Sequence, residues 1–193
     1  KIQAKAQEII DSDLSEGETR AMKVNEEDEI FVAKYKGEIR AVGNRCTYKG
    51  SRLSQGPMFD DKIVCCDHAC AYSIVTGRAE QGPGRDNIPT FSVTEREGKH
   101  FVEIPAGDIT KGNSSPMAVR DPENTTRYVI LGGGPAGLNC AETLRMAGFT
   151  GEIVVVSRES TLPYDRTLLS KELANGDASN WAMRSQEFME KHE

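Results

Sequence analysis

Short runs of β-branched and aromatic residues, separated by Gly, Pro, Asn and Asp, fill the first half of the chain. Lys36-Gly37 lies between two of these runs, Glu29–Tyr35 and Glu38–Val42, and predicts a tight β-hairpin. Strands at this short spacing indicate a small all-β sandwich or barrel over residues 1–105. We expect the opening stretch, Ile2–Ile10, to be a short helix or a frayed tail. The remaining strands are predicted at Ala21–Val24, Lys62–Cys65, Ala71–Val75, Phe91–Thr94 and His100–Ile104.

The last part of the chain, residues 127–193, has a different pattern. An apolar strand, Arg127–Leu131, runs into a glycine-rich turn, which is followed by a helical period ended by Gly148 and by a second β-branched run, Ile153–Val156. This order predicts a strand–helix–strand unit, the start of a parallel α/β sheet. Residues 106–126 are rich in Gly, Asn, Ser and Pro without a sustained apolar period, and they are predicted to be a linker.

Composition narrows the classes of function. The 193 residues carry a formal net charge of −6 and have a mean hydropathy of −0.52. No run of about 18 apolar residues is present, so we expect no transmembrane helix and no membrane partner. No basic stripe is available to neutralise phosphates, which argues against a nucleic-acid partner. No secretory signal is visible, and a cytoplasmic or a mitochondrial location fits the sequence.

Four of the five cysteines fall between positions 46 and 70, and clustered thiols in such a chain indicate metal or redox chemistry. Two boxes carry the candidate ligands, Cys46-Thr47-Tyr48 and Cys65-Cys66-Asp67-His68, and each is expected in a loop after a strand. Thiolates hold iron or zinc, and neutral imidazole completes mixed sites. The pattern resembles the Rieske [2Fe–2S] domain, in which Cys-x-His is followed by Cys-x-x-His. In that family two thiolates hold one iron and two imidazoles hold the other.

The resemblance implies that Cys46, Cys65 and His68 are ligands of a [2Fe–2S] cluster. The first histidine position holds Tyr48, and a phenol with an ordinary pKa near 10 is a poor ligand unless the metal depresses that pKa. Three interpretations therefore stay open. The fold binds a cluster with an unusual ligand, it has lost the cluster, or it binds zinc or another ion through the two cysteines and the histidine.

Other donors lie in the same part of the chain. Cys70 and His100 are substitutes for the missing imidazole, although their spacing selects neither of them. Without a ligand role, Cys66 and Cys70 are expected to be buried small apolar side chains. Ala69 stands where the family usually has a glycine after the second histidine.

Gly132, Gly134 and Gly137 form the pattern G-x-G-x-x-G between the predicted strand and helix, and Glu159 follows the next strand. In this context the pattern predicts a dinucleotide site. The glycines allow a tight turn, a close approach of the backbone to a pyrophosphate, and close packing of the helix on the strand. The phosphates would rest on the helix N-terminus, and Glu159 would accept hydrogen bonds from a ribose diol.

The segment after Glu159 indicates which dinucleotide binds. Leu162–Arg166, with Ser170-Lys171, resembles the Leu-Pro-Tyr-Asp-Arg…Leu-Ser-Lys segment of FAD-dependent ferredoxin reductases and apoptosis-inducing-factor-like flavoproteins. The resemblance implies FAD, with Arg166 at its pyrophosphate and Lys171 near its flavin ring. The paired prolines that follow the arginine in that family are Thr167-Leu168 here.

As a whole, the chain resembles apoptosis-inducing-factor-like flavoproteins that carry an N-terminal Rieske domain. We expect an α+β chain with an all-β Rieske-like domain at residues 1–105, the linker, and a truncated first βαβ unit of a Rossmann-type FAD domain at residues 127–193. The resemblance implies an oxidoreductase that passes electrons from NAD(P)H through FAD to the cluster. The alternative is a metal-free interaction or regulatory module beside a flavoprotein, with the cluster lost through Tyr48.

We expect the chain to be a fragment of such a protein. It stops inside a helix predicted from near Ser185, and it lacks the NAD(P)H-binding domain of the family, so we do not expect turnover from this chain alone. A single strand–helix–strand unit leaves its sheet faces uncovered, and residues 127–193 alone are therefore expected to hold FAD weakly. The sequence points to no particular redox partner.

Overall fold

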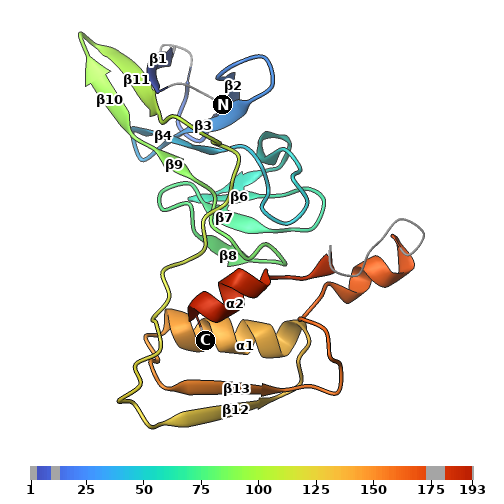
Figure 1. The fold of residues 1–193 in the computed structure, drawn as a ribbon. Coiled ribbons are helices and arrows are strands. Elements are labelled where there is room, and N and C mark those ends of the chain that lie inside the picture. Colours follow the sequence, from blue (N-terminus) through green and yellow to red (C-terminus); the bar gives the residue numbers. More distant parts are fainter. Residues whose placement is uncertain (1–3, 10–13, 173–180, 193) are drawn as a thin grey trace. The chain divides into compact units, whose positions relative to one another are not determined.

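The computed structural model describes residues 4–9, 14–172 and 181–192. The chain divides into two compact units, Lys1–Ser115 and Pro116–Glu193 (Figure 1). The boundary falls inside the predicted linker, and residues of that segment pack onto the unit on their own side. Ile109 is buried in a core of the first unit, whereas the backbone N–H of Ala118 donates to the carbonyl of Arg145 in the second, at 2.9 Å.

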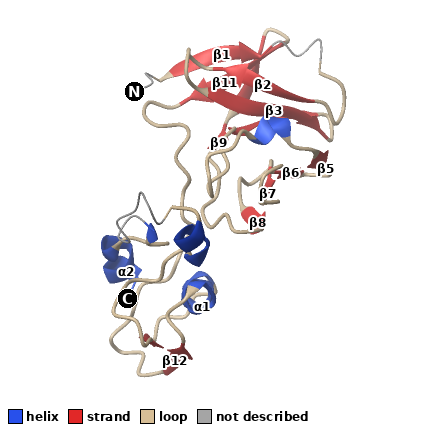
Figure 2. Cartoon of the chain, turned by 90° about the vertical axis from the view of Figure 1, so that its right-hand side faces the viewer, coloured by secondary structure: helices blue, strands red, loops and turns tan. Residues whose placement is uncertain are grey.

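The first unit is built from short strands that pair in antiparallel fashion (Figures 1 and 2). Among the described residues they form three sheets, with the orders β2-β3-β4-β9, β1-β11-β10 and β5-β6-β7-β8. The predicted run at 91–94 divides into two strands, and β5 and β8 lie outside the predicted runs. The strands are β1 (Lys5–Ile9), β2 (Thr19–Lys23), β3 (Glu29–Tyr35), β4 (Glu38–Gly43), β5 (Met58–Phe59), β6 (Lys62–Val64), β7 (Ala71–Ser73), β8 (Ala79–Gln81), β9 (Thr90–Phe91), β10 (Val93–Arg96) and β11 (Lys99–Ile104).

Strand β3 is buried on both faces and separates two cores of this unit. Ile30 and Val32 belong to one apolar cluster, together with Val102 of β11. Phe31 and Ala33 belong to a second cluster, which they share with residues of the β5–β8 sheet and its loops. Because side chains alternate across a strand, consecutive residues of β3 point to opposite faces. The sheet that contains β3 is therefore the middle layer of the unit.

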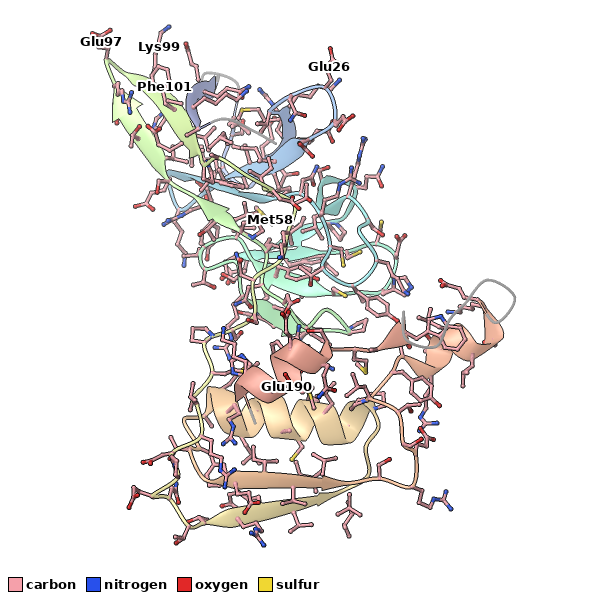
Figure 3. All side chains as sticks on the ribbon, in the orientation of Figure 1. Glu26, Met58, Glu97, Lys99, Phe101 and Glu190 are labelled. Carbon is pink, nitrogen blue, oxygen red and sulfur yellow. The ribbon has the colours of Figure 1, made fainter. Side chains whose placement is uncertain are left out.

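The predicted hairpin between β3 and β4 is confirmed. Lys36 and Gly37 both have positive φ, +53° and +76°, as a two-residue type I′ turn requires. The Glu16 carboxylate accepts the backbone N–H groups of Gly37 (2.9 Å) and Lys36 (2.5 Å), and these hydrogen bonds hold the pKa of Glu16 below its ordinary value. A second turn of this kind joins β10 to β11, and Figure 3 shows Glu97 at its tip.

The prediction of a helix or tail for the opening stretch is wrong for residues 5–9, which form β1. This strand pairs antiparallel with β11, with Lys5 opposite Ile104 and Ile9 opposite His100. Residue 4 belongs to no helix or strand, and the other residues of the predicted stretch lie outside the described residues. The local pattern of β1 is mostly polar, and its conformation is set by pairing with a strand more than 90 residues further along the chain.

The second unit begins with the predicted strand–helix–strand. Strand β12 (Arg127–Leu131) leads into helix α1 (Pro135–Met146), and β13 (Glu152–Val156) returns parallel to β12. Gly148 ends the helix as predicted, with φ +87°. The N–H of Gly148 donates to the Arg145 carbonyl (3.1 Å) and the N–H of Phe149 to that of Leu144 (3.0 Å), which is a Schellman motif.

A short 3-10 helix, η3 (Arg166–Ser170), and helix α2 (Gln186–His192) complete the described part of this unit. The helix predicted from near Ser185 is confirmed, and the Ser185 hydroxyl accepts the N–H of Phe188 at 3.1 Å. Between α1 and α2 lies an ion pair that the sequence did not indicate, Glu142 with Arg184, whose side chains are only 8% and 9% exposed. Among the described residues, no helix has the length and apolarity needed to cross a membrane.

Candidate cofactor sites

Two closed loops carry the predicted cluster ligands. In the first, which follows β4, Cys46 donates its N–H to the Ser51 carbonyl (2.9 Å) and accepts the N–H of Gly50 (2.8 Å). In the second, which follows β6, Cys65 donates to the Cys70 carbonyl (2.8 Å) and accepts the N–H of Ala69 (3.0 Å). These backbone hydrogen bonds hold each loop in place without help from the side chains at its tip.

A backbone contact sets the spacing of the two loops. Gly56 follows the 3-10 helix η2 (Leu53–Gln55), and a Cβ on it would lie 1.8 Å from the carbonyl oxygen of Val64, the residue before Cys65. Any side chain at position 56 would therefore push the loops apart. The Ser51 hydroxyl donates to the Asp67 carboxylate and links the loops a second time.

Three thiols converge beneath these loops. Cys46, Cys65 and Cys70 are 2%, 1% and 0% exposed, and the other two side chains lie within hydrogen-bonding reach of Cys46. The Cys70 thiol is the main cause that lowers the pKa of Cys46 to about 5, and the Tyr72 hydroxyl acts in the same direction against the effect of burial. Burial raises the pKa of Cys65, and the hydrogen bond to Cys46 raises that of Cys70. The thiolate is therefore favoured at Cys46.

Tyr72 of β7 is a fourth buried side chain beside the three thiols. Its hydroxyl lies 3.3 Å from Cys46 Sγ and accepts the backbone N–H of Thr47 at 3.1 Å. Burial, followed by the hydrogen bond with Cys46, raises the pKa of Tyr72. The hydroxyl therefore keeps its proton. It shares one hydrogen bond with the Cys46 sulfur and another with the Thr47 hydroxyl (3.0 Å), and an outer contact of this kind tunes a metal–thiolate centre.

The predicted imidazole and the tyrosine that replaces its partner meet at the outer side of the loops. His68 is exposed and Tyr48 is half-buried. Their rings make an edge-to-face contact, with centroids 5.0 Å apart and an interplanar angle of 83°. The Lys49 ammonium lies 5.1 Å from the centre of the Tyr48 ring. The loops thus group the four positions in two pairs, the buried sulfurs of Cys46 and Cys65 and the outer rings of Tyr48 and His68.

The remaining candidate donors lie elsewhere. Cys66 is exposed, contrary to the expectation of a buried side chain, because it lies at the tip of its loop beside the Asp67 carboxylate. His100 lies on β11, which packs on the opposite face of β3 from the thiols. Cys70 is buried as expected, but its contact with Cys46 was not foreseen, since the Cys-x-x-His spacing assigns no role to the position two residues after the histidine.

The donor set can be compared with the ligand pairs that a [2Fe–2S] cluster requires. A Rieske cluster needs two protein ligands at each iron, so a pair of thiolates beside a separate outer pair suits it. Here the pairs are Cys46 with Cys65, and His68 with Tyr48.

The glycine turn of the second unit has the geometry expected of a dinucleotide loop. Gly132 has φ +121°, and Gly134 is the residue before the first turn of α1. A Cβ on Gly137 would lie 1.9 Å from the carbonyl oxygen of Gly132, so only glycine permits this close packing of helix and strand. The first N–H groups of the helix have no partner within the helix, and the turn is accessible to solvent.

Glu159 and Arg166 come together at this turn. Arg166 Nη2 lies 2.8 Å from a Glu159 carboxylate oxygen, and its Nε lies 3.9 Å from the place that a Cβ on Gly134 would occupy. A guanidinium over exposed helix N–H groups suits a diphosphate. Lys171 is an exposed residue at the end of η3, and among the described residues no contact joins it to the other predicted FAD ligands.

Comparison with known proteins matches each unit to a family. Residues 7–92 match the Rieske [2Fe-2S] domain, and residues 126–191 match the pyridine nucleotide-disulphide oxidoreductase family. The chain is 33% identical over 184 residues to apoptosis-inducing factor 3 of Mus musculus, a match that covers 91% of this chain and 30% of that protein. The chain thus spans less than a third of the length of this relative.

Two bacterial relatives match one unit each. The 3-phenylpropionate/cinnamic acid dioxygenase ferredoxin subunit of Escherichia coli (strain K12) is 30% identical over 95 residues, which is 49% of this chain and 88% of that protein. The ferredoxin–NAD(+) reductase component of the p-cumate 2,3-dioxygenase system of Pseudomonas putida is 49% identical over 57 residues, which is 30% of this chain and 14% of that protein.

Proposed function

The chain belongs to the Rieske [2Fe–2S] family and continues into a pyridine nucleotide-disulphide oxidoreductase region, and from this we propose that it carries electrons between FAD and a Rieske cluster. In the proposed scheme NAD(P)H would be the electron donor of the whole protein, bound FAD would supply hydride and single-electron chemistry, and a bound cluster would supply a one-electron acceptor. The observation that carries the proposal is the convergence of buried Cys46 and Cys65 from two loops, with His68 of the Cys65 loop in ring contact with Tyr48 of the Cys46 loop.

In the β unit, we propose that Cys46 and Cys65 hold the inner iron and that His68 holds the outer one. A bound [2Fe–2S] cluster would supply a one-electron centre. The chain surrounds the inner thiolates with apolar residues of the second core cluster, which keeps water from the sulfurs. The Tyr72 hydroxyl lies 3.3 Å from Cys46 Sγ, and a hydrogen bond donated from it to a cluster-bound thiolate would raise the reduction potential of the centre.

In the second unit, we propose that the glycine turn and Arg166 hold the FAD pyrophosphate, that Glu159 binds a ribose and that Lys171 lies near the flavin. FAD supplies the hydride and single-electron chemistry when it is bound. The pairing of Arg166 with Glu159 keeps both charges close to the turn. The metal-free alternative has no separate support, because the matched family in the first unit is defined by its cluster.

Replacing Cys65 with serine tests the cluster, and replacing its exposed neighbour Cys66 with serine is the matched control. Iron and acid-labile sulfide are measured on the full chain after anaerobic reconstitution, with electron paramagnetic resonance after dithionite reduction. We expect the wild type and Cys66→Ser to hold equal amounts of iron and sulfide and to show a reduced-cluster signal. Cys65→Ser should lose both. A metal-free wild type, or equal loss in the two variants, would refute the assignment.

Replacing Arg166 with glutamine tests the FAD site, with Arg158→Gln, an exposed arginine nearby, as the control. A hydrogen bond from a charged group contributes about 1.5–3 kcal/mol, so we expect the Kd for FAD to rise more than about tenfold in Arg166→Gln. The Kd for FAD of the Arg158→Gln variant should stay near that of the wild type. Quenching of flavin fluorescence on titration with the full chain measures both. Equal effects in the two variants would contradict the role of Arg166.

A further inference from the structure

We propose that the Tyr48 hydroxyl, as a phenolate, is the fourth protein ligand of the cluster and shares the outer iron with His68. This inference rests on the proposed function, since it concerns the same cluster. It makes Tyr48 a ligand at the position where the family has a histidine. The outer iron of this chain would then carry one nitrogen and one oxygen ligand, where the family has two nitrogens.

The first argument is placement. Tyr48 occupies the second residue after Cys46, the position of the missing imidazole, and the first loop keeps its closed backbone despite the change. Its ring contacts the His68 ring edge to face, with centroids 5.0 Å apart. Two side chains that bind one ion must approach each other from two loops, and these two do so at the outer side of the site.

The second argument is the location of the other donors. Cys70 is fully buried, contacts Cys46 and lies with the inner thiols, away from the exposed His68. Cys66 is exposed, and its thiol is turned to the neighbouring Asp67 carboxylate. His100 lies on β11, the strand whose Val102 and Ile104 belong to the core on the other face of β3. The Asp67 carboxylate accepts the Ser51 hydroxyl and the Cys66 thiol. Tyr48, whose ring contacts that of His68, is therefore the donor that we assign to complete the pair.

The third argument is chemical. Tyrosine oxygen is a known protein ligand of iron, and a bound cation strongly favours loss of the proton from a coordinated group. On ligation the phenol O–H proton goes to solvent and an O–Fe bond forms, with no change in the oxidation state of the iron. An anionic oxygen in place of a neutral nitrogen lowers the reduction potential relative to a cluster with two imidazoles.

Resonance Raman spectroscopy of the reconstituted full chain tests the ligand directly. We expect vibrations of iron-bound tyrosinate, excited in a phenolate-to-iron absorption band, that shift when ring-deuterated tyrosine is incorporated. The variant Tyr48→Phe should lose these vibrations, and its cluster should be retained at least about tenfold less well, the effect of losing even an outer-shell partner. Tyr48→His should give a spectrum without tyrosinate bands and a more positive potential.

Tyr72→Phe is the matched control, because it removes the other tyrosine hydroxyl at the site and should keep the tyrosinate vibrations. A wild-type cluster without those vibrations, or a Tyr48→Phe cluster with an unchanged spectrum and retention, would overturn the inference and leave the proposed function standing. A wild type that binds no iron or sulfide would overturn both. If Tyr48→Phe fails to fold, as judged by circular dichroism, the presence or absence of tyrosinate vibrations in the resonance Raman spectrum of the wild type still tests the inference.

Discussion

The two units of this chain hold their candidate sites in different ways. In the β unit, the ligand loops are built over a core in which Phe31, Ile63 and Tyr72 are fully buried. In the second unit, the strands beside the glycine turn remain open, with Val129 and Leu131 of β12 57% and 83% exposed. Parallel strands are usually covered on both faces. The β unit therefore fixes its site by a closed core, whereas the second unit fixes its turn by local backbone geometry.

This difference has a consequence for stability and binding. Substitutions in the core of the β unit should disturb the cluster site even when they lie far from the ligands. In the second unit, the turn should tolerate changes on the open strands but respond to changes in a few buried polar contacts. The comparison thus separates a site that depends on packing from one that depends on individual hydrogen bonds and ion pairs.

The largest expected effect comes from the core of the β unit. Phe31→Ala should lower the free energy of unfolding of this unit by about 3–5 kcal/mol, because it leaves a cavity under the ligand loops. Val129→Ala on β12 should change the stability of the second unit by less than about 0.5 kcal/mol. Urea unfolding followed by far-UV circular dichroism measures both. Similar losses in the two variants would refute the contrast drawn here.

The next effect concerns the buried ion pair of the second unit. Glu142→Gln should lower the free energy of unfolding of this unit by about 3 kcal/mol, because it removes the negative charge that faces the buried Arg184 guanidinium. The control Glu152→Gln breaks an exposed pair with Arg127 and should cost less than about 1 kcal/mol. Fluorescence of Trp181, the only tryptophan of the chain and a residue of this unit, follows the unfolding. If the two variants lower the free energy of unfolding equally, burial does not account for the strength of the Glu142–Arg184 pair.

The smallest effects come from two residues with left-handed backbone. Ala69 has φ +54°, so Ala69→Gly should stabilise the β unit by up to about 1 kcal/mol. Gly148 has φ +87° at the end of α1, so Gly148→Ala should destabilise the second unit by about 1 kcal/mol. The midpoints of thermal unfolding of the two variants should move in opposite directions. A destabilising Ala69→Gly would show that the loop does not carry this strain.

Much of the fold followed from local signals in the sequence. The Lys36-Gly37 turn, the strand at 29–35 and the strand–turn–helix around Gly134 depend on neighbours in the chain, and all three are confirmed. Strand β1 was missed because its pairing with β11 is a long-range contact. The Glu142–Arg184 pair was missed for a similar reason, since charged residues in a helix pattern indicate a solvated face unless a distant partner buries them.

The candidate sites show the same division. The spacing of Cys46, Cys65 and His68 was sufficient to predict that the two loops carry the cluster ligands, and the roles of these residues stay a prediction. The approach of Cys70 to Cys46 was not predictable, because it depends on how the second loop closes on itself. The exposure of Cys66 has the same origin, since residues 66–69 form the exposed part of that loop between the buried Cys65 and Cys70.

The contact of Gly56 with the Val64 carbonyl gives the site a frame that contains no side chain. Over evolutionary time, the residues at the loop tips can therefore be exchanged without moving the positions from which they act. A lineage could replace an imidazole by a phenol here and still present it to the same point in space. Variation should accordingly be rare at position 56 and more frequent at position 48.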